Sequence, residues 1–321
     1  MKKLFLPFVV AVLFSGCEDV IDPGLPEADD PIVVDAWLYR KAEPQTISIT
    51  RANAYFDQNT PQGISGATVN VYDADDLSSP LPFLEEEPGK YVWNPINPSD
   101  SFGSVGQTYV LDIELNGDHF NSVSSMNRVP KVDSITWRLE PENAFFDDAY
   151  FGEFWARDFA GEGDVYWIKT WKNGEFLSKP HEIFIAYDAG FSEDGNADGL
   201  TFIQPIRDAM NPFDQDEDNN FLPPYKDPLC ENGLSTLPRE ELDSAYVEIN
   251  SITYEAYFFL FQVQLQTNRP GGFGELFSTP LANSNSNIFS DDSDQKIVGF
   301  FCTSAVSGLG RKFDCDAVFE D

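Results

Sequence analysis

The sequence predicts a mainly β protein, with an N-terminal immunoglobulin- or transthyretin-like β-sandwich followed by a β-rich domain that holds one packed helix. Short runs of β-branched and aromatic residues alternate with polar residues at period two, which is typical of half-buried strands. Clusters of turn residues separate these runs at short intervals, as all-β domains require. A helix is predicted in only one segment of the second half.

Residues 1–16 predict a lipoprotein signal peptide that is removed before Cys17. Two lysines precede the apolar run Leu4–Phe14, which is much shorter than the roughly 20 residues that span a bilayer. Ser15 and Gly16 are the small residues that a lipoprotein signal peptidase needs before its cut. We therefore expect Cys17 to carry lipid, and this lipid to be the attachment to the membrane.

An acidic tether is predicted over residues 17–31, rich in Pro, Gly and Asp. Glu18 and Asp19 directly follow the lipidated Cys and resemble the surface-export signal of lipoproteins in Bacteroidota. The resemblance implies an outer-membrane protein that faces the extracellular side. The alternative is that the two carboxylates belong to a solvated linker and are not an export signal.

The charge balance excludes one class of partner. The chain has 54 acidic and 20 basic residues, a formal net charge of −34, whereas nucleic-acid binding depends on Lys and Arg that neutralise phosphates. The same negative charge disfavours attachment to anionic lipid and favours the binding of cations. Hydrophobic residues make up 42% and aromatic residues 14% of the chain, which is enough for a packed core.

The first domain is predicted over residues 32–128. Alternating segments predict its strands, and the Asn116-Gly117 pair predicts a tight hairpin between the last two. The predicted strands are 32–39, 45–50, 65–72, 89–93, 106–115 and 119–125.

The second domain is predicted over residues 129–321, after the Val129-Pro130 boundary. An Asn173-Gly174 turn follows one of its strands, and a long acidic, Pro-containing loop is expected over 188–228. Ser251 is the predicted N-cap of a buried helix over about 252–267. The predicted strands are 133–139, 164–171, 245–250, 297–301 and 312–318.

The acidic loop carries the best candidate for a metal site. Asp194, Asn196 and Asp198 have the D-x-N-x-D-G spacing of a calcium loop, which places alternate oxygens on one side. A second triplet repeats the spacing at Asp214, Asp216 and Asp218. Neither triplet has a Glu at the twelfth position, which excludes an EF-hand. These six residues predict calcium binding, with a solvated acidic loop as the alternative.

Three cysteines remain after Cys17, so at most one internal disulfide can form. Cys302 and Cys315 flank a Gly-containing segment that could turn as a hairpin, so this pair is the expected disulfide. The alternative is that all three thiols are buried as small apolar groups.

Nothing in the sequence predicts a catalytic site. The chain has two His and no G-x-S-x-G motif, so a Ser-His-Asp arrangement finds little support. Glycoside hydrolysis needs a pair of carboxylates, but 54 acidic residues offer too many pairs to indicate an active site. The six Trp residues could stack on sugar rings, but burial in β cores is the more usual role.

The order of several segments resembles a known family. These segments are Cys17-Glu-Asp-Val-Ile-Asp-Pro, Ile32-Val-Val-Asp-Ala-Trp-Leu, Ser65-Gly-Ala-Thr-Val-Asn-Val, Gly106-Gln-Thr-Tyr-Val-Leu, Val129-Pro-Lys-Val-Asp-Ser-Ile, Thr279-Pro-Leu-Ala-Asn-Ser-Asn-Ser-Asn-Ile and Lys296-Ile-Val-Gly-Phe-Phe. The chain is similar to family 4249 of the domains of unknown function, lipoproteins of Bacteroidota often encoded beside SusC-type TonB-dependent transporters. A polar insertion after Ile288 departs from the family pattern. The resemblance implies an outer-membrane location and a SusC-type transporter as a neighbour, but it implies no catalytic residues.

Three functions follow as hypotheses. The leading one is a non-enzymatic accessory or ligand-binding subunit of an outer-membrane complex, with a SusC-type transporter as the β-barrel partner and lipid as the membrane attachment. The second is a structural subunit of an outer-membrane secretion or barrel-assembly machine. The third is a calcium-dependent surface hydrolase, for which the acidic loop is the motivation.

Overall fold

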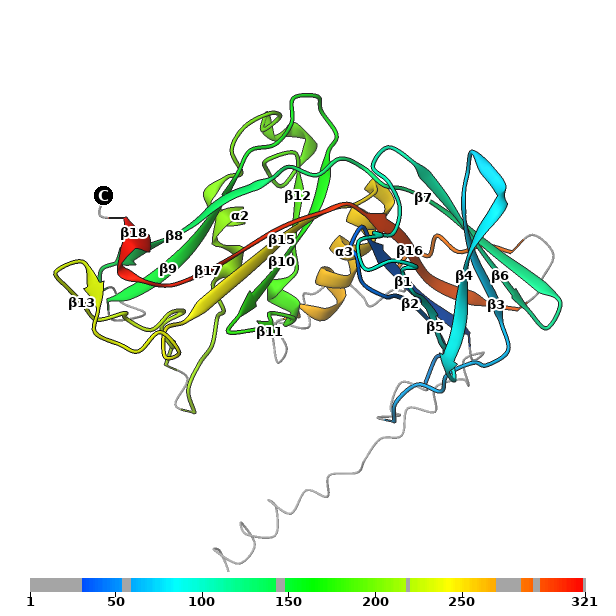
Figure 1. Ribbon diagram of the computed structural model, residues 1–321, viewed down its shortest axis with the longest axis horizontal. Coiled ribbons are helices and arrows are strands. Elements are labelled where there is room, and N and C mark those ends of the chain that lie inside the picture. Colours follow the sequence, from blue (N-terminus) through cyan, green and yellow to red (C-terminus); the bar gives the residue numbers. More distant parts are fainter. Residues whose placement is uncertain are drawn as a thin grey trace, which may run out of the picture.

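The computed structural model describes residues 31–53, 59–142, 148–217, 220–269, 284–290 and 295–319, and the side chains of Asp194 and Phe319 are outside this description. Strands dominate the described chain, so the predicted mainly β class is confirmed. Figure 1 shows two β-rich halves side by side, with one helix between them.

The first half is one eight-stranded sheet in the order β16-β1-β2-β5-β4-β3-β6-β7. Thr303 in β16 donates a 2.9 Å hydrogen bond to Ser124 Oγ in β7, so the two edge strands of the sheet meet and the sheet curls on itself. The strands are β1 (Ile32–Tyr39), β2 (Gln45–Arg51), β3 (Thr68–Asp73), β4 (Asp76–Glu87), β5 (Lys90–Trp93), β6 (Thr108–Leu115), β7 (Asp118–Ser125) and β16 (Ile297–Ser304).

Alternation along the chain creates the core of this sheet. In β1 and β6 every second side chain is buried, as the period-two pattern predicts. The β6–β7 hairpin turns at Asn116 and Gly117, which both have positive φ (56° and 94°). Those angles are the ones a two-residue hairpin turn requires, so the predicted hairpin is confirmed.

The second half contains three small sheets. β10 (Val165–Lys172) pairs with β11 (Glu175–Phe176), β12 (Phe184–Tyr187) and β15 (Ser244–Ser251), and β15 pairs with β17 (Val306–Lys312). A three-stranded sheet joins β18 (Val318–Phe319), β8 (Val132–Glu140) and β9 (Ala149–Ala156), and β13 (Cys230–Glu231) pairs with β14 (Leu234–Ser235). In the core of the second half, Trp137 stacks on Phe313 with ring centroids 4.8 Å apart.

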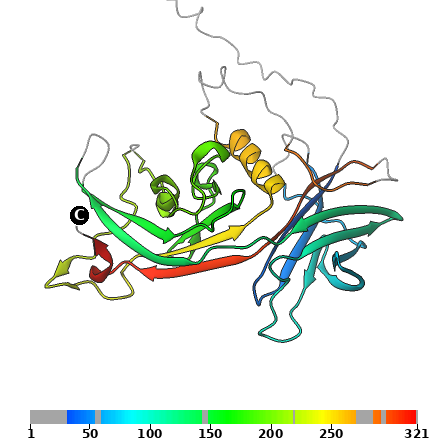
Figure 2. The same ribbon diagram turned by 90° about the horizontal axis from the view of Figure 1, so that it is seen from above.

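The C-terminal segment belongs to both halves. β16 pairs in parallel with β1 of the first sheet, and β17 begins two residues after β16 ends but pairs with β15 of the second. Figures 1 and 2 show these two strands as one continuous path across the molecule. The region predicted as a separate second domain, 129–321, therefore supplies a strand to the first.

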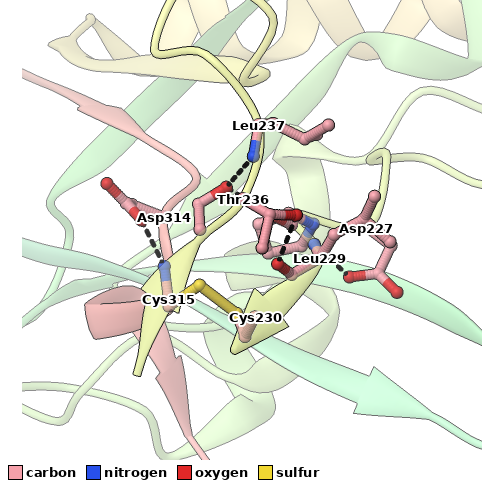
Figure 3. Close-up of a disulfide and its surroundings, with 9 residues drawn as sticks. Asp227, Leu229, Cys230, Thr236, Leu237, Asp314 and Cys315 are labelled. Carbon is pink, nitrogen blue, oxygen red and sulfur yellow. Dashed lines mark hydrogen bonds between the residues drawn. A yellow bond between two sulfur atoms is a disulfide. The ribbon is translucent and has the colours of Figure 1, made fainter. Parts of the chain in front are cut away.

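The disulfide joins Cys230 to Cys315, and the expected Cys302–Cys315 pair is wrong (Figure 3). The segment between Cys302 and Cys315 is the extended strand β17 and not a hairpin, and an extended strand advances about 3.3 Å per residue. Cys302 is a free thiol, fully buried near the first sheet's junction with the helix. The disulfide ties the β13–β14 hairpin to the 3-10 turn η5 (Cys315–Ala317).

The predicted helix is observed as α3 (Tyr254–Thr267). Its N-cap is Thr253, whose Oγ1 accepts a 3.2 Å hydrogen bond from Ala256 N. Ser251, the predicted N-cap, is the last residue of β15, and its hydroxyl instead donates to Asn127 O. Figure 2 shows α3 (orange) toward the same side of the molecule as the start of β1.

The segment predicted as an acidic loop, 188–228, has structure of its own. It contains η2 (Glu193–Gly195), α2 (Gln204–Arg207) and η3 (Asp208–Met210), and its side chains Phe202, Ile206 and Met210 are buried in the core of the second half. A further 3-10 turn, η1 (Pro180–Glu182), precedes it. None of the helices in the described part of the chain combines the length and apolar character needed to cross a bilayer.

Candidate functional site

The structure does not bring the three residues of the first predicted calcium triplet together as one ligand set. Asn196 has a left-handed backbone with φ 48° at the end of η2, and the side chain of Asp194 lies outside the described residues. Asp198 instead meets Asp158 and Asp188, and one carboxylate oxygen from each lies within 4.8 Å of the others. Asp158 closely follows β9 and Asp188 follows β12. Sequence spacing could not reveal this group, because its members come from three separate segments.

Burial makes these carboxylates costly to ionise. Asp158 and Asp188 are each 4% exposed. Burial, with repulsion from neighbouring carboxylates, raises the pKa of both side chains. The Tyr166 hydroxyl donates to Asp158 at 2.6 Å, and the backbone N–H groups of Gly163 and Asp164 donate to Asp188 at 2.9 and 3.0 Å.

The hydrogen bonds of Arg128 go to groups other than this three-carboxylate group. The Arg128 guanidinium forms a two-nitrogen contact with Asp164, with hydrogen bonds of 3.1, 3.0 and 2.6 Å. Its remaining bonds go to the carbonyl oxygens of Ala160 and Gly161. Clustered carboxylate oxygens are the donor set that a hard divalent cation such as Ca²⁺ takes.

The second predicted triplet holds its own loop together. Asp214 forms an ion pair with Lys179, and Asp216 accepts hydrogen bonds of 2.9 and 3.0 Å from Asn220 N and Nδ2. Asp218 lies outside the described residues. These two Asp residues are not members of the one three-carboxylate group found among the described residues.

The outer face of α3 is unusually apolar. Tyr254, Phe258, Phe261 and Leu265 are 47%, 40%, 40% and 48% exposed, and their spacing of four, three and four residues places them on one side of the helix. We name these four residues the aromatic stripe. The prediction of a buried helix is therefore wrong for this face, because only Ala256 and Leu260 are buried in α3. The helix packs through these two residues and the half-buried Tyr257 and Phe259 against the core between the halves.

A hollow of about 700 Å³ continues the stripe toward the first sheet. Tyr254 and Phe258 line one wall, and Val123 of β7 and Phe289 line the other. Val123 and Phe289 are 59% and 63% exposed. The apolar surface therefore extends from α3 onto the first half.

Two of the tryptophans lie at the junction between the halves. Trp37 of β1 contacts Trp167 of β10 edge-on at 5.1 Å and stacks on Phe300 of β16 at 5.6 Å. Lys169 Nζ lies 4.1 Å from the Trp167 ring centroid, and burial lowers its pKa to about 8. This packing supports the core interpretation for these two rings.

The predicted lipidation and export residues Cys17, Glu18 and Asp19 lie outside the described residues. A family model described as "Domain of unknown function (DUF4249)" matches residues 18–308. No curated protein matches the chain.

Proposed function

Because the chain belongs to the DUF4249 family, we propose that it is a non-enzymatic accessory or ligand-binding subunit of an outer-membrane complex, with a SusC-type TonB-dependent transporter as its barrel partner. In this proposal Cys17 carries the lipid that holds the protein on the membrane, and Glu18 and Asp19 direct it to the extracellular side. The family carries no established chemistry, so the surface of this chain must support the proposal.

The observation that carries the proposal is the aromatic stripe on α3. Monomeric proteins rarely leave a continuous apolar surface uncovered, and such a surface marks an interface. Protein interfaces are enriched in Tyr and Phe and depleted of charge at their centre. The stripe has this composition: the only charged residue in α3 is Glu255.

The position of the stripe supports a partner in the membrane. In Figure 2, α3 lies toward the same side of the molecule as the start of β1, whose first residue is Ile32. A tether from residue 18 to residue 31 reaches at most about 50 Å when fully extended. The lipid anchor would therefore keep this side of the molecule within reach of a membrane-embedded protein.

Copurification tests the proposal. A C-terminally tagged chain, solubilised with mild detergent, is expected to bring down an outer-membrane transporter barrel. The double variant Phe258→Glu and Phe261→Glu should lose the barrel, because charge at the centre of an apolar interface is left unpaired. The control is Ile96→Glu: Ile96 is 92% exposed and belongs to the loop between β5 and β6, outside the stripe.

Each outcome discriminates between functions. Recovery of the wild type alone, or equal recovery of the barrel by both variants, contradicts docking through the stripe. A secretion or assembly barrel in place of a transporter favours the structural-subunit alternative. The hydrolase alternative requires turnover of surface glycans or peptides by the purified protein, lost on addition of a chelator.

Calcium binding remains a separate proposal. The meeting of Asp198 with Asp158 and Asp188 favours it over the two sequence triplets taken alone. The cation would neutralise carboxylates that are costly to ionise without it.

A further inference from the structure

Three aromatic side chains form a row across one face of the sheet that contains β11, β10, β15 and β17 (Figure 1). They are Phe176 of β11, Trp171 of β10 and Tyr246 of β15, which stand opposite one another in the paired strands. Their neighbouring ring centroids are 5.0 and 5.3 Å apart. Phe176 and Tyr246 are each 38% exposed, and Trp171 is partly exposed. We name these residues the aromatic row, and solvent reaches all three of them.

Two glycines of β17 leave room for the Tyr246 ring. Gly310 is paired with Tyr246, and Gly308 lies two residues earlier in the same strand. Neither glycine has a positive φ, so the backbone conformation does not require glycine there. A Cβ at Gly308 would clash with the Tyr246 hydroxyl, and a Cβ at Gly310 would lie 3.3 Å from Tyr246 Cδ2. The Tyr246 ring therefore lies over β17, where glycines inside a strand permit a close approach.

A buried ion pair holds the Tyr246 ring in this orientation. The Tyr246 hydroxyl donates a 2.8 Å hydrogen bond to Glu248 Oε1, and Lys41 Nζ lies 2.7 Å from the same oxygen. Glu248 is buried, and these two donors compensate for the burial of its charge. A ring that is fixed before a ligand arrives loses little conformational entropy on binding, which favours affinity.

Charged groups of both signs border the aromatic row. Lys41 Nζ lies 3.7 Å from Glu43 Oε1, and the Glu43 side chain is 57% exposed. Lys169 precedes Trp171 by two residues, hence on the same face of β10, and its Nζ lies 5.9 Å from the Phe176 ring centroid. The two lysines disfavour a cationic ligand, whereas Glu43 and the net charge of −34 disfavour an anionic one. The surroundings of the row therefore favour a neutral ligand.

We propose that the aromatic row is a binding surface for a neutral carbohydrate. The C–H face of a sugar packs on the exposed rings, and its hydroxyls bond to Lys41 and Glu43 beside them. A hydroxyl both donates and accepts, which suits a border that offers an ammonium and a carboxylate. A proline-rich peptide also packs on aromatic surfaces, but proline has no N–H to donate to Glu43. The inference rests on the ligand-binding part of the proposed function and names the class of ligand.

Calorimetric titration of the purified mature chain, in a detergent without a sugar headgroup, tests the surface with defined probes. The neutral probes are cellohexaose, maltohexaose, mannohexaose and xylohexaose. The charged probes are the galacturonate hexamer and, at mildly acidic pH, the glucosamine hexamer. At least one neutral probe should bind about tenfold or more tightly than both charged probes. Binding of none of the neutral probes, or tighter binding of a charged probe or of oligoproline, overturns the proposal.

Variants test the row and the glycines beneath it. Phe176→Ala removes one ring from the short strand β11 and should weaken the neutral probe about tenfold. Gly308→Ala removes no ring, but its methyl group should displace the Tyr246 ring and weaken the probe as well. Phe213→Ala is the matched control, since Phe213 is exposed and lies outside the row, and it should bind like the wild type. Urea midpoints establish that each variant is folded, and an unchanged affinity in folded Phe176→Ala contradicts the proposal.

Tryptophan emission locates the bound sugar. The neutral probe should change the emission of the wild type. Trp171→Phe keeps an aromatic ring, so it should still bind the probe but lose this change. A change that persists in Trp171→Phe places the sugar elsewhere and contradicts the assignment. Sugar binding by the purified chain and copurification of the barrel are separate measurements, so this inference and the membrane partnership can fail independently.

Discussion

Lys169 Nζ donates a 2.6 Å hydrogen bond to the Tyr39 hydroxyl, and this bond joins β10 of the second half to β1 of the first. The Lys169 ammonium also lies 4.3 Å from the Tyr39 ring centroid. Burial lowers its pKa to about 8, which is below the value of about 10.4 for an unfolded lysine. The contact between the two halves is therefore sensitive to pH in the mildly alkaline range.

Raising the pH from about 7.5 to 9.5 should stabilise the wild type relative to Lys169→Met. In this window the folded Lys169 loses a proton that the unfolded chain retains, so its contribution to the free energy of unfolding rises with pH. The expected relative gain is about 2 kcal/mol. Urea unfolding at the two pH values measures it. A difference between the two proteins that stays constant with pH contradicts the prediction.

Reduction of the Cys230–Cys315 disulfide should destabilise the protein by about 2–4 kcal/mol, because the bond closes a long loop in the unfolded chain. The two cysteines are 85 residues apart in sequence. Reductant should lower the urea midpoint of the wild type and leave the double variant Cys230→Ser and Cys315→Ser unchanged. Peptide mapping without reduction should find the Cys230 and Cys315 peptides linked. A linked Cys302 peptide contradicts the pairing.

Calcium should raise the melting temperature of the wild type and not that of Asp188→Asn. The pKa of Asp158 and Asp188 is raised in the folded state. Without calcium, their contribution to stability is therefore largest below the unfolded pKa and is lost as the pH rises through the folded pKa. The calcium effect should thus be larger at neutral than at acidic pH, where protons compete.

Asp216→Asn is the matched control for the calcium experiment, because Asp216 belongs to the second sequence triplet. It should keep the full calcium response. Loss of the response in Asp216→Asn but not in Asp188→Asn would place calcium at the second triplet and contradict the three-carboxylate group.

Cys17→Ala should release the protein from the membrane, since no lipid can then be attached. Detergent-phase partitioning measures the change, and unchanged partitioning of the variant contradicts lipidation at Cys17. The variant Glu18→Gln and Asp19→Asn tests the export signal separately. It should still partition into detergent but lose its accessibility to protease added to whole cells.

Local patterns predicted a large part of the fold. Alternation predicts β1 and β6, and Asn116-Gly117 predicts β7 as the hairpin partner of β6, because side-chain direction and turn angles depend on neighbouring residues. The N-cap of α3 was misplaced by two residues, since Ser251 and Thr253 are both good caps. Tertiary contacts decide between them: the Ser251 hydroxyl bonds Asn127 O and Ala305 N, and Thr253 caps the helix.

Contacts between distant residues could not be predicted in this way. The apolar run of β16 is compatible with any sheet. Its parallel pairing with β1 buries Phe301 in the core of the first half and Cys302 in the core between the halves. Glu182 Oε1, which is buried without a hydrogen-bond partner among the described residues, likewise has no sequence signal, because the residues around Glu182 come from two separate segments, 172–182 and 212–214. The exposure of the aromatic stripe depends on which face of α3 packs on the core.

The sequence by itself determined the mainly β class and the family, since each of these depends on short-range pattern or on the order of segments along the chain, and the lipidation of Cys17 stays a prediction. The tertiary structure alone decided which cysteines pair, which carboxylates meet and which face of α3 stays uncovered. The physical reason is that the free energy of packing is shared among residues far apart in the chain, and short-range patterns do not record which of them become neighbours.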